Sequence, residues 1–597
     1  MSDSILANVD MVLAISEDTI NYQFLQLFDR GVIENEWKLL VRNATEKSSL
    51  VLVTQDNSDF DTKLSTWIST QSNIANLLIE KKYEQFGQML GESTDELWDY
   101  GWSGTIAAPT ITILSKDTQS LMFNVKFNSG SKLYSGLQHT KAVSIFDLSE
   151  AIYAFKVPIG RFEITSTKEL LTPESQKQAA TIISDTGLGE SDFSMESLFL
   201  DFENADIANF DSEKSSFPKL SSSAIKTLQI TILDYFKQVV AKQKHPYVLG
   251  YGMSLKTIDK KKDNQKALFL PTSLRFSTSY SKTKGESALN FLMMVGNTDF
   301  PSGQTVGVLP KSLLESKSYD NKNSSLDGVF AIDYQLFQKT IISPLTDKIG
   351  VGADIPSKAK YVSTKVQSSG KAQQWSTSAQ ISYMLESIQH WVGAHAFVNY
   401  SMDFSFDLMN DASNGLLWKG NLTSSINVKI TESSLPHKND PALYETWLST
   451  SGDYKKGPSG NLGQIGTIKM SIKPGTTGHL IFSNPQITRP EFGLTKKPIT
   501  MDMLSLGIFG GLSPIESDSS SGAATATELA QNTFKSAKNA VTNAKSSIDD
   551  ALDKMFKIKI ILPLGQLYTF SNIQLYSNRN TDNNPVTLNV SYVPVST

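Results

Sequence analysis

Cysteine is absent from this chain. Its absence excludes disulfide bonds, thiol nucleophiles and sulfur-ligated zinc, and it leaves the redox compartment undecided. Long hydrophobic runs are also missing: no stretch approaches the roughly 18 consecutive apolar residues of a membrane-spanning helix. Residues 1–10 contain no basic segment and no apolar segment, so no secretory signal peptide is predicted. We therefore expect a soluble protein that is cytoplasmic or released by a non-standard route.

The chain has no strong excess of either charge. Lysine and arginine number 55, aspartate and glutamate number 60, and the formal net charge is −5. Because the two signs are interspersed, we predict no nucleic-acid partner. The tight basic run at 260–262 is flanked by Asp259 and Asp263, which is typical of a solvated hairpin tip; a phosphate-contacting patch is the alternative.

Motifs of the common enzyme classes are missing as well. The chain contains no Gly-x-Ser-x-Gly elbow, no Gly-x4-Gly-Lys-Ser/Thr loop, no Gly-x-Gly-x-x-Gly turn and no His-Glu-x-x-His helix. We therefore predict a protein that is not an enzyme and has no cofactor. No catalytic, cofactor-binding or metal-binding residue is assigned, and the ligand-binding residues are left open.

Two polar clusters resemble metal sites only in part. The spacing of His390 and His395 aligns their side chains neither on one face of a helix nor on one face of a strand. Asn578, Asn580 and Asp582 provide alternate oxygen ligands, but the glycine and the terminal glutamate of a calcium loop are absent. Both clusters are interpreted as ordinary structural or surface residues.

A third cluster, Asp56, Asp59 and Asp61, lies in a predicted loop. Paired carboxylates perform acid–base chemistry when a cleft raises the pKa of one of them, and a sequence shows neither condition. The cluster is interpreted as a solvated turn.

The chain nevertheless contains enough apolar residues to form large hydrophobic cores. Hydrophobic residues make up 40% and charged residues 19%, and 30 phenylalanines and 19 tyrosines favour strands. A length of 597 residues allows two large domains.

Helical spacing of apolar residues occurs in two early segments. Ser16 is a good N-cap, Ile15 and Ile20 are placed to form a hydrophobic staple across it, and the helix is expected to end at Gly31. A second helix is predicted from near Ser223, ending before Pro246. The apolar stripe of the second helix consists of Ile225, Leu228, Ile232, Tyr235, Phe236, Val239 and Val240.

Alternation with period two predicts strands with one buried face, as in antiparallel sheets. The earlier strands contain Ile111 and Ile113; Phe123, Val125 and Phe127; and Tyr153, Phe155, Val157 and Ile159. The later strands contain Tyr400, Met402, Phe404, Phe406 and Leu408; Ile426, Val428 and Ile430; and Ile468, Met470 and Ile472.

The pattern around the first helix returns 317 residues later. Val12, Ala14, Ile15, Ser16, Ile20, Phe24 and Phe28 correspond to Val329, Ala331, Ile332, Asp333, Phe337, Ile341 and Leu345. At an offset of 316, Trp102, Gly104 and Ile106 correspond to Trp418, Gly420 and Leu422. Two groups of residues that recur at nearly the same offset predict an internal duplication, with one unit at 1–320 and a second at 321–597.

The C-terminal part of the second unit has a different composition. A Ser-rich loop is predicted at 513–527 and a long helix at 528–556. In this helix Phe534, Val541, Ile548 and Met555 recur every seven residues, which predicts close packing on its own domain. A partner-binding or membrane-active helix is the alternative.

Five segments carry a resemblance to a known family. They are Val12-x-Ala14-Ile15-Ser16 with Asn21, Gly104-x-Ile106-x-x-Pro109, Gly250-Tyr251, Pro271-Thr272-Ser273 with Phe276, and Leu289-Asn290-Phe291-Leu292-Met293-Met294. With them the chain resembles the OrfX family and its forty-seven-kilodalton relative. These are accessory proteins of clostridial neurotoxin gene clusters, with relatives in other bacterial and insect-active toxin loci.

The resemblance implies a fold of the tubular lipid-binding (TULIP) superfamily. The expected fold class is α+β and mostly antiparallel β, with two duplicated TULIP-like units, each a curled sheet wrapped around a long helix. The resemblance carries no individual functional residue across, because the family's lipid contacts are diffuse apolar linings. The Ser-rich loop at 513–527 and the helix predicted at 528–556, in which Ala537, Ala544 and Ala551 also recur every seven residues, depart from the family pattern.

Three functions follow from these features. The first is non-enzymatic binding of a lipid or other hydrophobic ligand by a toxin-cluster accessory or insecticidal component, with possible peripheral membrane contact. The second is a scaffold that assembles with co-encoded toxin-complex proteins without a small ligand. The third is a membrane-inserting toxin in which 525–556 or amphipathic strands refold on contact.

Overall fold

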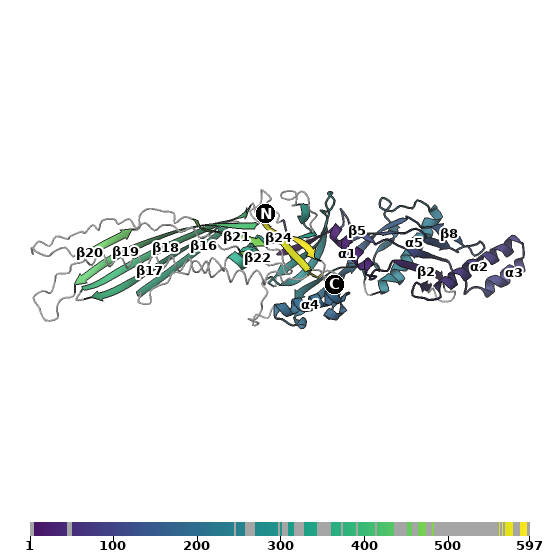
Figure 1. Cartoon of the computed structure of the whole chain (residues 1–597), viewed down its shortest axis with the longest axis horizontal. Helices are drawn as coiled ribbons and strands as arrows, with labels where there is room; N and C mark the ends of the chain where they lie inside the picture. The colour runs from purple at the N-terminus through teal and green to yellow at the C-terminus, as the bar shows by residue number, and fades with distance from the viewer. Residues whose placement is uncertain are drawn as a thin grey trace, which may run out of the picture. The chain divides into compact units, whose positions relative to one another are not determined.

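The computed structural model describes residues 5–43, 50–243, 246–256, 269–296, 299–300, 308–315, 327–342, 360–371, 374–389, 392–411, 415–434, 450–455, 464–472, 480–482, 560–561, 564, 567–576 and 585–593 (Figure 1). The chain divides into two compact units. The N-terminal unit comprises Ile5–Ala331, Lys557–Thr569 and Asn589–Thr597. The C-terminal unit comprises Met1–Ser4, Ile332–Phe556 and Phe570–Leu588.

Helices of the described residues are concentrated in the first half of the chain. They are α1 (Glu17–Asp29), α2 (Phe60–Ile79), α3 (Tyr83–Glu92), α4 (Pro173–Thr186), α5 (Ser222–Gln238) and the single turn α6 (Tyr334–Phe337). A short 3₁₀ helix, η3 (Val240–Lys242), follows α5.

Strands make up most of the remaining described structure. Those up to residue 295 are β1 (Met11–Ser16), β2 (Glu36–Asn43), β3 (Leu50–Thr54), β4 (Tyr100–Thr105), β5 (Thr110–Ile113), β6 (Ser120–Lys126), β7 (Lys132–Ser135), β8 (Ser144–Asp147), β9 (Ile152–Ile164), β10 (Phe193–Leu200), β11 (Asp206–Phe210), β12 (Val248–Leu255), β13 (Pro271–Ser279) and β14 (Ala288–Val295). Those after it are β15 (Gly328–Ile332), β16 (Lys360–Lys371), β17 (Gln374–Gln389), β18 (Val392–Asp411), β19 (Gly415–Ser434), β20 (Thr450–Lys455), β21 (Gln464–Ile472), β22 (Leu480–Phe482), β23 (Ile560–Ile561), β24 (Leu567–Leu575) and β25 (Val586–Val593).

Both predicted early helices are present. The Ser16 hydroxyl accepts a hydrogen bond from Thr19 N and caps α1, and Ile15 and Ile20 on either side of the cap are buried. In α5 the Ser221 side chain accepts from Ala224 N, two residues before the predicted start at Ser223. Most of the predicted stripe of α5 is buried, as its period of 3.6 requires.

Antiparallel sheets organise the N-terminal unit. One sheet has the order β23-β12-β10-β9-β6-β5, with β11 also paired to β9, and a second has the order β3-β2-β4-β7-β8. In a third sheet β13, β14, β1 and β15 are consecutive neighbours, followed by β25 and β24. The pairs β6–β9, β9–β10, β2–β4 and β1–β14 are antiparallel, so the predicted strand-rich, mostly antiparallel α+β class is confirmed.

In the C-terminal unit a sheet of long strands has the order β16-β17-β18-β19-β21-β22, with β20 paired to β19 (Figure 1). The pairing of β18 with β19 runs without a register shift from Val392 opposite Ser434 to Asp411 opposite Gly415. The strands predicted from the alternation at 400–408, 426–430 and 468–472 are β18, β19 and β21.

The predicted repeat has a local counterpart in the structure. Ser16 follows β1 and caps α1, and Asp333, at the offset of 317, follows β15 and caps α6 by accepting from Gln335 N and Leu336 N. The agreement covers one strand and the first helical turn on each side. Duplication of whole units, with the boundary between 320 and 321, stays a prediction.

Several predicted features lie outside the described residues. They are the basic run 260–262, His390, the cluster Asn578, Asn580 and Asp582, the Ser-rich loop 513–527 and the helix 528–556. Within the described residues, none of the helices has both the length and the apolar character required to cross a membrane.

Candidate functional site

Aromatic rings fill the interior of the N-terminal unit around α5. The Phe236 ring centroid lies 4.5 Å from that of Phe202, 5.3 Å from Phe155 and 5.5 Å from Trp37. These rings come from two different sheets, since Trp37 belongs to β2 and Phe155 to β9. Edge-to-face and tilted contacts of this kind are the packing that aromatic cores prefer. The part of the interior next to α5 is therefore occupied by side chains.

Two partly buried acids lie beside this aromatic interior. Tyr100 donates its hydroxyl to Asp234 Oδ2, and Gln55 Nε2 donates to Glu34 Oε2. Burial raises the pKa of Asp234 and the pKa of Glu34, and in each case the hydrogen bond that the carboxylate accepts opposes the shift. Each acid is satisfied by a neighbouring side chain, which explains how it is accommodated next to apolar rings.

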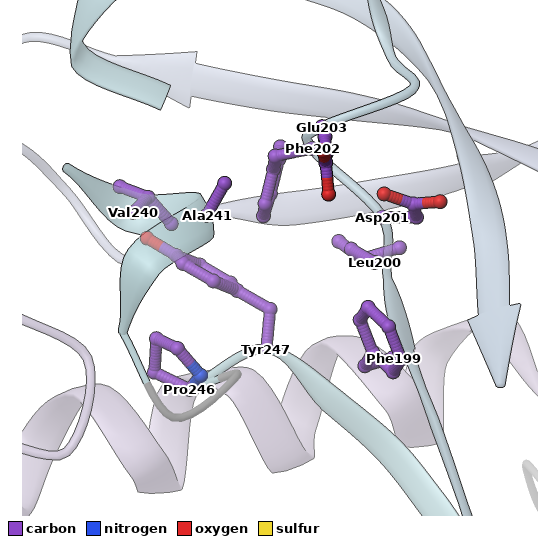
Figure 2. Close-up of a pocket in the computed structure, with 9 residues that line it drawn as sticks. All are labelled: Phe199, Leu200, Asp201, Phe202, Glu203, Val240, Ala241, Pro246 and Tyr247. Atoms are coloured by element: carbon purple, nitrogen blue, oxygen red, sulfur yellow. The ribbon is translucent and has the colours of Figure 1, made fainter. Parts of the chain in front are cut away.

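A small pocket opens at the margin of the aromatic interior (Figure 2). It has a volume of about 120 Å³. Two chain segments line it: the end of β10 with the following turn, and η3 with the segment leading into β12. The lining residues are Phe199, Leu200, Asp201, Phe202, Glu203, Val240, Ala241, Pro246 and Tyr247. We call this the Tyr247 pocket.

Local hydrogen bonds hold the two segments of the pocket in place. Leu200 N donates to Tyr247 O at 3.1 Å, which joins the end of β10 to the segment before β12. The turn after β10 is closed by Asp201, whose Oδ1 accepts from Asn204 N at 3.2 Å and whose Oδ2 accepts from Asn204 Nδ2 at 2.7 Å. An aspartate that bonds to the backbone three residues on is a common way to end a strand in a tight turn.

The walls of the pocket are mainly aromatic. The Phe202 and Tyr247 ring centroids are 5.2 Å apart and their planes make an angle of 76°. Tyr247 also meets Phe123 and Phe24 edge-on, so its far side belongs to the packed interior. Figure 2 shows the Phe199 ring across the space from Tyr247.

Burial raises the pKa of Tyr247 far above its ordinary value near 10, and the charge of Glu34 adds to the effect. The phenol is therefore neutral at physiological pH and is not poised to act as a base or nucleophile.

The acidic cluster predicted from the sequence lies elsewhere, at the start of α2. Asp56, Asp59 and Asp61 are all exposed. Asp59 pairs with Lys63 and Asp61 with Lys38. The hydrogen bond from Lys63 lowers the pKa of Asp59, which is the opposite of the shift that a general acid requires.

Of the two neighbouring histidines His390 and His395, only His395 falls within the described residues. It lies on β18, opposite Glu386 of β17 and Thr431 of β19. Across the described part of the chain, no three side chains of His, Asp or Glu gather into a group that could hold a metal ion.

No direct signal for the Tyr247 pocket is present in the sequence. Its two segments are about forty residues apart, and each reads alone as the end of an ordinary element. A weak signal was available: Phe202 stands between the acidic residues Asp201 and Glu203 directly after a strand, and a Pro-Tyr pair precedes the next strand at 246–247.

Comparisons with known proteins find several matching solved structures, including the following two. One is P47 from Clostridium botulinum A2, with 11% sequence identity, a TM-score of 0.39 and coverage of 97% of each chain. The chain is similar to P47 over nearly its whole length. The resemblance to OrfX and its forty-seven-kilodalton relative predicts a match of this kind.

The other is a crystal structure of lipopolysaccharide binding protein, with 10% identity, a TM-score of 0.23 and coverage of 98% of this chain and 99% of that chain. No protein-family model matches the chain, and neither does any curated protein sequence.

Proposed function

We propose that this chain binds a lipid or other hydrophobic ligand without converting it, and that the Tyr247 pocket contacts one end of that ligand. The observation that carries the proposal is a cavity with aromatic walls at the margin of the aromatic interior around α5. Apolar walls with a few polar groups at the rim are the usual composition of ligand pockets.

The size of the pocket limits what it takes. A cavity of about 120 Å³ is smaller than the roughly 300–1,000 Å³ of pockets that enclose whole drug-sized ligands. It therefore suits a head group or the end of a chain. The rest of a lipid would lie outside the aromatic interior around α5, because that space is filled by side chains.

Lipid analysis of the purified protein tests the proposal. Organic extraction followed by mass spectrometry identifies any bound lipid, and native mass spectrometry of the same sample counts the molecules. We expect one or a few lipids per chain, either carried through purification or taken up on addition. A protein that is free of lipid and takes up none would overturn the proposal.

A pocket-filling variant connects the ligand to this site. Ala241 lines the pocket, and Ala241→Leu is expected to lower lipid occupancy at least fivefold because the added side chain takes up the cavity. Ala180→Leu is the matched control, since Ala180 is exposed on α4 and does not line the pocket. Equal lipid loss in both variants would point to a general effect on folding instead.

A second candidate function, assembly with co-encoded toxin-complex proteins, is favoured by the α2–α3 hairpin. Ile79 is 76% exposed and Tyr83 is 64% exposed at the turn between these helices. Large apolar side chains exposed together are typical of interaction surfaces.

The double variant Ile79→Ser/Tyr83→Ser tests this second function by size-exclusion chromatography with each purified co-encoded protein. Tyr22→Ser is the control, because Tyr22 is also exposed, at 44%, but lies on α1. A complex that forms with the wild type and with Tyr22→Ser, but not with the double variant, would support this function. Absence of any complex would count against it.

A further inference from the structure

We infer that the Tyr247 pocket binds an alkylammonium group, and that a quaternary ammonium such as the trimethylammonium of choline fits it best. This inference rests on the proposed function and names the chemistry of the ligand end that enters the pocket. Three features carry it: the arrangement of the rings, the carboxylates beside them, and the size of the cavity.

Three aromatic side chains, Phe199, Phe202 and Tyr247, line the pocket. Phe202 and Tyr247 stand nearly perpendicular, at 76°, with centroids 5.2 Å apart, and so form a corner. Figure 2 shows Phe199 on the opposite side of the space and Pro246 below Tyr247. A cation within about 6 Å of an aromatic centroid is attracted by the ring quadrupole, and quaternary ammonium groups are typically held by several such rings.

Two carboxylates stand beside the aromatic corner. Asp201 and Glu203 belong to the turn after β10, and Figure 2 shows both along the same side of the pocket. Asn204 holds the Asp201 carboxylate through two hydrogen bonds, of 2.7 and 3.2 Å. A carboxylate can accept further bonds, and its charge remains available to a cation. These two charges would repel an anionic ligand end, and an apolar end would gain nothing from them.

The described lining of the pocket contains no positive charge. The nine described lining residues include two carboxylates and neither lysine nor arginine. Lys242 follows the lining residue Ala241, but its ammonium donates to Gln238 Oε1 of α5 at 3.0 Å. Lys244 and His245 precede Pro246 in the sequence and lie outside the described residues.

The volume and the apolar lining select among ammonium ions. A primary ammonium has three N–H donors that need polar partners in three directions, and the two carboxylates of the pocket lie on one side of it. A quaternary ammonium has no N–H donor and presents only methyl groups to its surroundings. Walls made of Phe199, Phe202, Val240 and Pro246 satisfy methyl groups, and about 120 Å³ is a head-group-sized space.

Calorimetric titration with three small probes tests the inference. The probes are choline, tetramethylammonium, and 3,3-dimethyl-1-butanol, which has the shape of choline without its charge. We expect both cations to bind at least tenfold more tightly than the alcohol, a difference of about 1.4 kcal/mol. The double variant Asp201→Asn/Glu203→Gln should weaken choline binding at least fivefold and leave binding of the alcohol unchanged.

The control variant is Glu213→Gln, which removes an exposed carboxylate that does not line the pocket. It should bind choline as the wild type does. If the alcohol binds as tightly as choline, the ammonium inference is overturned while hydrophobic binding at the pocket stands. If no probe binds, the inference is overturned, and lipid extraction decides the proposed function separately.

Vesicle flotation then separates a lipid head group from a free ammonium compound. Retention on phosphatidylcholine vesicles but not on phosphatidylglycerol vesicles, lost in the double variant, would support a lipid head group as the source. Choline binding in solution with no retention on either vesicle would support a free ligand. Retention on phosphatidylglycerol alone, without choline binding, would overturn the inference.

Discussion

The side-chain amide of Asn21 pairs with both backbone groups of Ile111. Asn21 Oδ1 accepts from Ile111 N at 2.7 Å and Asn21 Nδ2 donates to Ile111 O at 3.1 Å. One helical turn earlier, Glu17 Oε2 accepts from Ile113 N at 2.7 Å. Residues two apart on a strand are separated by about 6.8 Å and residues four apart on a helix by about 6 Å, so the two spacings match. Helix α1 thereby satisfies the open edge of β5, the terminal strand of its sheet.

Replacement of Asn21 should open this edge. Asn21→Ala leaves Ile111 N and O without their partner, and we expect a loss of about 1–3 kcal/mol together with faster amide exchange in β5. Hydrogen exchange measured by mass spectrometry on peptides that cover residues 110–113 gives the local readout. Asn209→Ala is the control, because Asn209 bonds only to the exposed Asp206 in the described structure, at 2.9 Å. Unchanged exchange at β5 would show that α1 does not protect the edge.

The Glu17 carboxyl gives the same contact a pH dependence. Burial raises the pKa of Glu17 above its ordinary value of 4.5, against the lowering effect of the Ile113 hydrogen bond. The folded chain therefore holds this proton to a higher pH than the unfolded chain does. Stability falls as pH rises from the unfolded pKa through the folded pKa, and it stays lowered above that window.

Glu17→Gln removes this titration and keeps an oxygen that can accept from Ile113 N. We expect the stability of the variant relative to the wild type to increase as pH is raised from 4 to 7. Urea unfolding of both proteins at several pH values measures the difference, which cancels the titration of other groups. A difference that is constant over this range, or that decreases, contradicts the raised pKa.

The aromatic interior should be sensitive to loss of a single ring. Phe236 lies within 6 Å of rings from three other elements, so Phe236→Ala leaves a large cavity and should cost about 3–5 kcal/mol. Ile230→Ala, on the face of α5 where Ile230 is 41% exposed, should cost less than about 1 kcal/mol. Thermal unfolding of the N-terminal unit, followed by near-ultraviolet circular dichroism, compares the two. Similar losses would mean that α5 is not enclosed by the two sheets.

The elements that the sequence predicted well are those with a strong local period. The cap at Ser16, the stripe of α5 and the alternation in β9 depend on residues close together in the chain. Helix α4 was missed although Thr172, Pro173 and Gly187 mark its ends in the usual order, because most of its residues are polar and its apolar residues are few.

The candidate site was not predictable in the same way. Phe202 and Tyr247 meet only because β10 and β12 pair in one sheet, and a cavity is the volume that side chains leave empty. In the sequence alone, Asp201 and Glu203 are typical of a solvated turn. Only the fold places them beside the aromatic rings of the pocket. Pairing across the sheet, which no local period encodes, creates the pocket.

A glycine in the family-like segment at 104–109 has a physical explanation that leads to a last prediction. A Cβ at Gly104 would lie 2.3 Å from Ser131 Oγ and 2.6 Å from Ser131 Cα. Ser131 is buried, and its Oγ donates to Thr105 O at 2.9 Å and accepts from Thr105 N at 3.1 Å.

Gly104→Ala must therefore displace Ser131 and break both bonds to Thr105, and we expect a loss of at least about 2 kcal/mol. Gly87→Ala is a matched control in α3, where a new Cβ meets open space. In a helix this change should raise stability by about 0.5–1 kcal/mol. Urea unfolding measures the stability of both variants. A loss for Gly104→Ala and a gain for Gly87→Ala would show that position 104 requires glycine because Ser131 approaches it closely. A neutral Gly104→Ala would mean that β4 and the segment at Ser131 separate easily, and the glycine would then need another explanation.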